Sequence, residues 1–205
     1  MRSFRRAVAG MLVLSTLVCS GCFLKSKTKK ENGYSYDDIE AVMGEYSTFK
    51  TETLKDYEDE DRHDADFKYV ICSGREAQEV YKKGINLSNR FPTLKVSKVF
   101  LCMPYKSSLF FMITPEEQDK GNMYFKKFCN NSKDVGDYKT TEVEKKGEYQ
   151  YLISESDAYY TAVYQRGETI LYMRVHKKSD NVVEIADAVC KKLGITSLTE
   201  WIQEN

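Results

Sequence analysis

Four β-rich segments follow one another near the C-terminal end of the chain with very short gaps between them. They are 138–144, 148–154, 158–165 and 168–176. All four are rich in tyrosine and β-branched residues, which favour strands. Gaps of two or three residues join only antiparallel neighbours, because a parallel pair needs a crossover of a dozen or more residues. The run therefore predicts an antiparallel meander, and it limits the folds open to this chain more than any other feature.

Two strand–helix units precede the meander. The first has an apolar strand before Ser73-Gly74-Arg75-Glu76, and the second has one before Thr114-Pro115-Glu116-Glu117. Both tetrapeptides fit a capping box, in which the Ser or Thr caps the helix and the Glu bonds back to it. The similarity of 67–91 and 109–131 leaves two interpretations: a weak internal repeat, or one common way to start a helix used twice.

The remaining elements complete a domain over residues 36–205. Asp37 is expected to cap an early helix, and 95–103 with 109–113 form a hairpin. A helix begins at Asp180 or Asn181 and ends at Gly194, and a short last helix follows Ser197. Strands grouped apart from helices indicate an α+β fold. We expect a single domain, mainly an antiparallel sheet with helices packed on one face.

The N-terminal segment has the pattern of an export signal. Arg2, Arg5 and Arg6 precede an uncharged, mostly apolar run over 7–18, and no acid occurs before Glu31. A basic start, an apolar stretch and small residues before a cleavage site define a secretory signal peptide. A retained N-terminal membrane helix is the alternative, although the apolar run is shorter than the roughly 20 residues that a spanning helix needs.

Cys19-Ser20-Gly21-Cys22 closes this segment. In a cytosolic protein this C-x-x-C predicts a redox pair or half of a zinc site. After an export signal it resembles the lipobox of bacterial lipoproteins, with Cys19 where Leu is commonest. The resemblance implies cleavage before Cys22 and a diacylglyceryl group, with its palmitate-like chains, on that cysteine. The other possibility is ordinary secretion with Cys22 as a free thiol.

The lipobox divides the chain into three parts. Residues 1–21 form a lipoprotein signal peptide, 22–35 form the lipidated cysteine and a basic tether, and 36–205 form the folded domain. The stretch from Thr114 to Gly194 resembles uncharacterised surface lipoproteins of Gram-positive anaerobes in its order of helix, tyrosine-rich strands and helix. That resemblance implies a lipid-anchored place on the extracytoplasmic face of the cell membrane. It implies no activity and no functional residues.

Charge and cysteine content narrow the function classes. The chain has 31 basic and 31 acidic residues, but residues 32–205 keep 24 basic and 30 acidic ones. An acidic body without a basic stripe argues against a nucleic-acid partner. Four more cysteines, each in an apolar setting, are either buried free thiols or disulfide partners. They are Cys72, Cys102, Cys129 and Cys190.

Few residues suggest catalysis or metal binding. The acidic stretch over 56–66 is either a solvated loop or a cation site, and it lacks the glycine and ligand order of an EF-hand. The histidines are His63 and His176, and neither lies in a recognisable motif. We therefore predict no metal, no cofactor and no catalytic residue.

The tyrosines of the meander are the candidate contact surface. Strand alternation turns some of them away from the core, where tyrosine packs well against a protein or a sugar. The candidate contact residues are Tyr149, Tyr151, Tyr160 and Tyr164. The alternative is a cross-strand tyrosine ladder that stabilises the sheet.

These features together favour a non-catalytic, lipid-anchored binding or scaffolding module that contacts an envelope protein or a glycan. Two alternatives stay open. One is an envelope hydrolase that uses paired carboxylates, and the other is a lipoprotein that binds a glycan or another small ligand.

Overall fold

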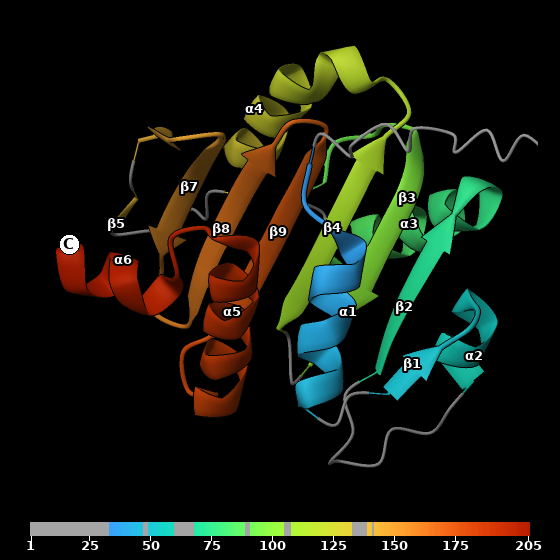
Figure 1. The fold of residues 1–205 in the computed structure, drawn as a ribbon, viewed down its shortest axis with the longest axis horizontal. Coiled ribbons are helices and arrows are strands. Elements are labelled where there is room, and N and C mark those ends of the chain that lie inside the picture. The colour runs from blue at the N-terminus through green and yellow to red at the C-terminus, as the bar shows by residue number, and fades with distance from the viewer. Residues whose placement is uncertain are drawn as a thin grey trace, which may run out of the picture. The chain divides into compact units, whose positions relative to one another are not determined.

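The computed structural model describes residues 33–46, 49–59, 68–88, 91–104, 108–132, 139–140 and 142–205 (Figure 1). Cys22, the signal peptide, most of the tether and His63 lie outside these residues, as does most of the acidic stretch. Residues 31–205 form one compact unit.

A mixed sheet forms the centre of this unit. Its strands are β1 (Phe49–Thr51), β2 (Lys68–Ser73), β3 (Val96–Cys102), β4 (Leu109–Pro115), β5 (Lys139–Thr140), β6 (Glu144–Lys146), β7 (Tyr149–Glu155), β8 (Tyr159–Arg166) and β9 (Thr169–His176). The order across the sheet is β1-β2-β3-β4-β9-β8-β7-β5, and β6 also pairs with β7. Only β1 and β2 are parallel, and the other pairs are antiparallel.

The predicted meander is present as β7, β8 and β9, joined by tight turns. The predicted segment 138–144 contributes two short strands instead of one. β5 pairs Thr140 with Ser154, whereas β6 pairs Glu144 with Tyr151. The register differs by one residue between these two pairings.

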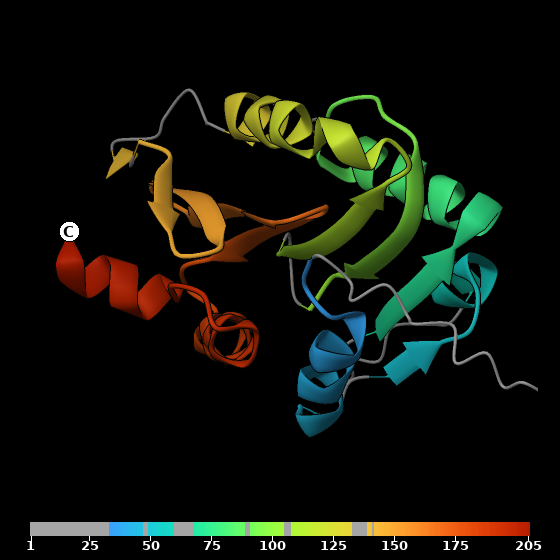
Figure 2. The ribbon, with the colours of Figure 1, turned by 45° about the horizontal axis from the view of Figure 1, so that its top comes forward.

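Helices cover both faces of the sheet. Helices α1 (Tyr36–Glu45), α5 (Asp180–Leu193) and α6 (Leu198–Glu204) pack on one face, and α3 (Gly74–Ser88) and α4 (Gly121–Ser132) pack on the other (Figure 2). The short α2 (Leu54–Asp59) contacts β1, β2 and α3. The single α+β domain with a mainly antiparallel sheet is confirmed, but the expected restriction of the helices to one face is wrong.

The central strands explain why both faces are covered. In β4 every residue from Leu109 to Ile113 is buried, and in β3 every residue from Val99 to Cys102 is buried. A strand that is apolar on both sides must be covered on both sides. These runs were visible in the sequence, and their lack of alternation was the signal for a second helical layer.

Each face has its own hydrophobic core. The core below α1, α5 and α6 includes Phe110, Tyr164 and Trp201, and the core below α3 and α4 includes Phe111 and Phe128. Because residues 31–205 contain both cores in one compact unit, they have what a domain needs to fold on its own. All four cysteines of this unit are buried thiols, as the first of the two alternatives expected.

Helix ends follow the prediction in the C-terminal part of the chain. Gly194 takes a left-handed conformation after α5, and Ser197 and Glu200 form a complete capping box on α6. At the start of α1, Ser35 rather than Asp37 is the cap, since its Oγ accepts a hydrogen bond from Asp38 N at 3.2 Å.

The two capping boxes predicted at Ser73 and Thr114 do not form, so both predictions are wrong. Glu76 accepts a hydrogen bond from Leu54 N at 3.1 Å instead of bonding back to its own helix. Thr114 and Pro115 are the last residues of β4, and α4 begins only after the short 3₁₀ helix η1 (Gln118–Lys120). Both units are a strand followed by a helix on the same face, and the internal repeat stays a prediction.

Candidate functional site

The register of the strands places a row of polar residues on the α1 face of the sheet, at the end where β2 and β4 finish and β9 begins. This is the upper end of the sheet in Figure 1. Ser73 pairs with Lys98, and Lys98 pairs with Thr114. Thr169 is next in register, because Ile113 pairs with Ile170. Two residues further along β3 and β4, the same face becomes fully apolar. The polar row therefore marks the place where this core ends.

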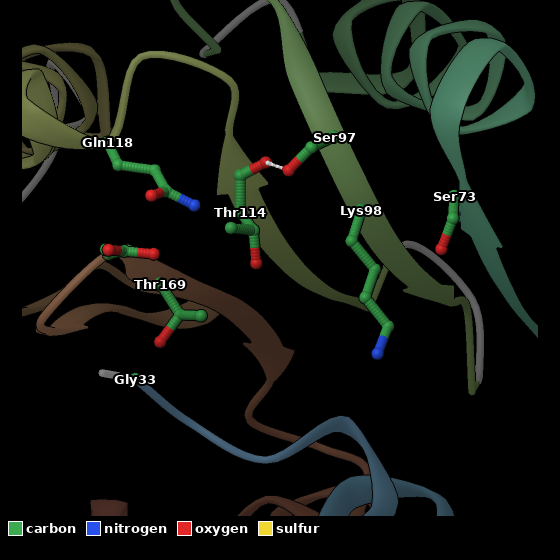
Figure 3. Close-up of a pocket in the computed structure, with 8 residues that line it drawn as sticks. Gly33, Ser73, Ser97, Lys98, Thr114, Gln118 and Thr169 are labelled. Atoms are coloured by element: carbon green, nitrogen blue, oxygen red, sulfur yellow. Dashed lines mark hydrogen bonds between the residues drawn. The ribbon is translucent and has the colours of Figure 1, made fainter. Parts of the chain in front are cut away.

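A hollow of about 290 Å³ lies over this row (Figure 3). We name it the polar hollow; its lining residues are Gly33, Ser73, Ser97, Lys98, Thr114, Gln118, Glu168 and Thr169. Its volume is at the small end of the range for ligand pockets, and its lining is more polar than is usual for them. It suits a small polar molecule.

The start of the domain lies across the polar hollow. Tyr34 N donates a hydrogen bond to Thr169 Oγ1 at 2.6 Å, and Thr169 Oγ1 donates one to Arg166 O at 3.1 Å. A Cβ atom on Gly33 would lie only 2.6 Å from the same Thr169 Oγ1. A glycine is therefore needed here because the chain passes so close to β9.

The hydroxyl of Tyr36 ties the next two strands together. It donates to Lys98 O at 3.1 Å and lies 3.1 Å from Thr114 Oγ1. The Lys98 ammonium is 4.3 Å from the centroid of the Tyr36 ring, a cation–π contact. Among the described residues Lys98 forms no ion pair, so its ammonium remains available to a ligand.

The arrangement in the polar hollow is suited to binding. Ser97 Oγ is occupied, since it donates to Thr114 O at 3.0 Å. The Gln118 side chain points across the hollow toward Thr114 and Thr169 (Figure 3). Together with Lys98 and the Glu168 carboxylate, it supplies donors and acceptors to one small molecule. The described lining of this hollow contains neither His nor Cys.

A second hollow of about 480 Å³ lies at the same end of the sheet on the opposite face. We name it the amide hollow; its lining residues are Asn122, Lys126, Lys145, Glu148, Tyr149, Gln150, Gln165 and Gly167. Lys145, Gln150 and Gln165 are cross-strand neighbours on β6, β7 and β8. The first two turns of α4 provide the facing wall, with Asn122 in the first and Lys126 in the second. The β8–β9 turn separates this hollow from the polar hollow.

The predicted tyrosine surface is wrong for Tyr149, Tyr151 and Tyr164, which are buried below α5, α6 and the loop between them, whereas for Tyr160 it stays a prediction. Tyr149 is 7% exposed, Tyr151 2% and Tyr164 0%, and Tyr160 is half-buried against the same core.

These tyrosines instead follow the ladder alternative. Tyr151 pairs with Tyr164 across the strands with ring centroids 5.9 Å apart. The Tyr164 hydroxyl donates to Thr196 O at 2.9 Å, and burial raises its pKa well above the usual value. The alternation of the strands separated the two faces correctly, but it gave no signal for which face the last two helices would cover.

The other sequence candidates do not meet in either hollow. His176 is at the opposite end of β9 from Thr169 and packs edge-on against Tyr159. Each hollow has one carboxylate in its described lining, Glu168 or Glu148, so neither has the two convergent carboxylates that the hydrolase alternative requires.

Two further findings concern the described part of the chain as a whole. No group of three or more His, Cys, Asp or Glu side chains within it is arranged to hold a metal ion. None of its helices combines the length and the apolar character needed to cross a bilayer.

The sequence missed both hollows. Their residues come from at least four separate segments each, and their common feature is a polar residue at the end of an otherwise apolar strand face. Ser73 after Ile71 and Thr114 after Met112 carried that signal. Comparison with protein-family models, with curated proteins and with solved structures gave no match.

Proposed function

We propose that the protein is a lipid-anchored, extracytoplasmic binding module of a bacterial cell envelope, without catalysis of its own. The proposal joins two features. The lipobox implies a lipid on Cys22, and the polar hollow offers a site for a small polar ligand. Two acyl chains anchor a protein to a membrane stably, so retention needs no spanning helix.

The position of Gly33 carries the proposal. This residue lines the polar hollow and follows Cys22 by eleven positions. Eleven extended residues span at most about 40 Å. A lipid on Cys22 therefore keeps the polar hollow close to the membrane surface, where it would meet ligands released from or bound at the envelope. The lysines of the tether would hold the chain near anionic phospholipid.

Anchoring is tested by exchanging single cysteines. Wild-type protein is expected in the membrane fraction and labelled by radioactive palmitate, and Cys22→Ala is expected to lose the label. Cys19→Ala is the matched control, because Cys19 leaves with the signal peptide and the label should remain. A label that survives in Cys22→Ala would refute the lipid anchor.

Binding is tested by thermal unfolding in the presence of amino acids, simple sugars and sugar phosphates. A ligand that binds only the folded protein raises the unfolding temperature. We expect one class to raise it in wild type and much less in Lys98→Ala. Lys178→Ala removes an exposed lysine at the other end of the sheet and should respond as wild type does. Equal responses in all three proteins, or no response in any, would count against the polar hollow as the binding site.

A further inference from the structure

We propose that the amide hollow binds an acidic saccharide, that is, a sugar that carries a carboxylate or a phosphate. This site lies on the opposite face of the sheet from the polar hollow and shares none of its residues. The inference does not depend on lipidation of Cys22.

Three side-chain amides form a connected network in the amide hollow. Gln150 Nε2 donates to Asn122 Oδ1 at 3.0 Å and to Gln165 Oε1 at 2.6 Å. Both N–H groups of Gln150 are therefore used, and its Oε1 remains as an acceptor. The Asn122 amide accepts through its oxygen, which leaves its NH₂ group as a donor. An acceptor and a donor thus stand side by side, with orientations that the network fixes.

Gln165 is held in place by the β8–β9 turn and by the start of α4. Gln165 is 4% exposed, and its Nε2 donates to Gly167 O at 3.0 Å. Gly121, the first residue of α4, passes so close that a Cβ atom there would lie 2.8 Å from Gln165 Nε2. A site whose groups are already fixed loses little entropy when a ligand binds. The close approach of α4 therefore favours a preformed site.

Two lysines on facing walls add positive charge. Lys126 extends from α4, and Lys145 is the cross-strand neighbour of Gln150. Neither forms an ion pair within the described part of the chain, not even with Glu148, which lines the same hollow. In contrast, the next residue, Lys146, pairs with Glu200 at 3.1 Å. The ammonium groups of the hollow are thus available to an anionic ligand.

The lining favours a saccharide over a nucleotide or a peptide. Tyr149 is its one aromatic residue in the described lining, and this side chain is 7% exposed and belongs to the opposite core. A base therefore has no ring on which to stack, and a peptide has no apolar pocket for an anchor residue. Sugar hydroxyls both donate and accept, so they match the Asn122 donor beside the Gln150 acceptor. The acidic group is placed with the two lysines.

The test is a titration of ¹⁵N-labelled residues 31–205 by NMR, which observes the side-chain amides of Asn122, Gln150 and Gln165 directly. The probes are digalacturonic acid as the carboxylate, glucose 6-phosphate as the phosphate, maltose as the neutral sugar, and inorganic phosphate alone. We expect at least one acidic sugar to shift these three amides at millimolar concentration, with maltose and inorganic phosphate much weaker. Which acidic sugar binds more tightly identifies the acidic group.

Lysine variants test whether the acidic sugar binds in the amide hollow. Replacing Lys126 and Lys145 together by alanine removes two charge-assisted contacts and should weaken binding by about tenfold or more. Lys127→Ala, on the same helix but outside the lining, should leave the affinity unchanged. The spectrum of each variant also reports whether it is folded. Equal shifts with maltose, equal shifts with inorganic phosphate, no shift with any probe, or an unchanged affinity in the double variant would each overturn the proposal.

Discussion

Alanine at Gly33 should destabilise the domain, although the residue is close to the start of the described chain. The added Cβ atom would lie 2.6 Å from Thr169 Oγ1 and 2.7 Å from Thr169 Cγ2. Thr169 is 4% exposed, and its hydroxyl bonds to both Tyr34 N and Arg166 O. It cannot move aside without loss of a hydrogen bond.

The size of the effect follows from two routes that the chain can take. If residue 33 stays in place, overpacking costs about 1–3 kcal/mol, and a lost hydrogen bond adds about 1 kcal/mol. If residues 33–34 instead detach, the buried Tyr34 side chain becomes exposed, which costs about 1.5–3 kcal/mol. The protein takes whichever of these two responses costs less free energy. We therefore expect the free energy of unfolding to fall by about 2 kcal/mol.

Urea unfolding followed by circular dichroism measures this loss. Gly44→Ala is the matched control, because Gly44 is within α1 and no atom outside its own stretch of helix backbone lies within 4 Å of the added Cβ. In a helix, alanine is more stable than glycine by up to about 1 kcal/mol. The same substitution should therefore act with opposite signs at the two positions. A Gly33→Ala protein as stable as wild type would refute the close packing of this segment on β9.

Three further predictions concern the buried tyrosines, a buried cysteine and a helix cap. Burial raises the pKa values of Tyr34 and Tyr164, so above about pH 10 the unfolded chain binds fewer protons, and each group lowers the free energy of unfolding by about 1.4 kcal/mol per pH unit. Unfolding at neutral and alkaline pH measures this loss, and equal stability at both would contradict it. Burial raises the pKa of Cys72 to about 12, so iodoacetamide should react slowly with it in the folded protein and rapidly in urea. Mass spectrometry detects the label, and equal rates would argue against a buried thiol. Ser197→Ala removes the α6 capping box and should cost about 1 kcal/mol in urea unfolding, whereas no loss would mean that the cap is not formed.

Local patterns predicted the elements of this fold well where the pattern was strong. Short gaps fixed the antiparallel order of β7, β8 and β9, and the apolar stripe with Gly194 fixed α5 and its end. These features depend only on residues that are close to one another in the chain. They can therefore be predicted from the sequence alone.

It was harder to predict which distant parts of the chain pack over a given strand face or helix end. The tyrosines of the meander alternate as expected, but Thr196 and Trp201, which cover them, follow in the chain after the strands. Likewise Glu76 fits a capping box, yet Leu54 N competes for its carboxylate. In both cases a distant partner decided the outcome, and no local pattern reports such a partner.

The hollows were beyond local pattern for the same reason. Lys98 and Thr114 become neighbours only when β3 and β4 pair, and the amide network needs Asn122 from α4 over Gln150 on β7. Polar residues that end an apolar strand face would have been a usable signal for the first hollow. The second needed the position of α4, which the sequence did not provide.

The proposed function requires Cys22 to be the lipidated first residue of the mature protein. Mass spectrometry of the N-terminal peptide, prepared from membranes of cells that produce the full chain, tests it most directly. We predict a peptide that begins at Cys22 and carries a diacylglyceryl group on its sulfur. A peptide that begins at Met1 or after another cleavage site, or one that begins at Cys22 with an unmodified thiol, would show that the protein is not lipid-anchored through Cys22.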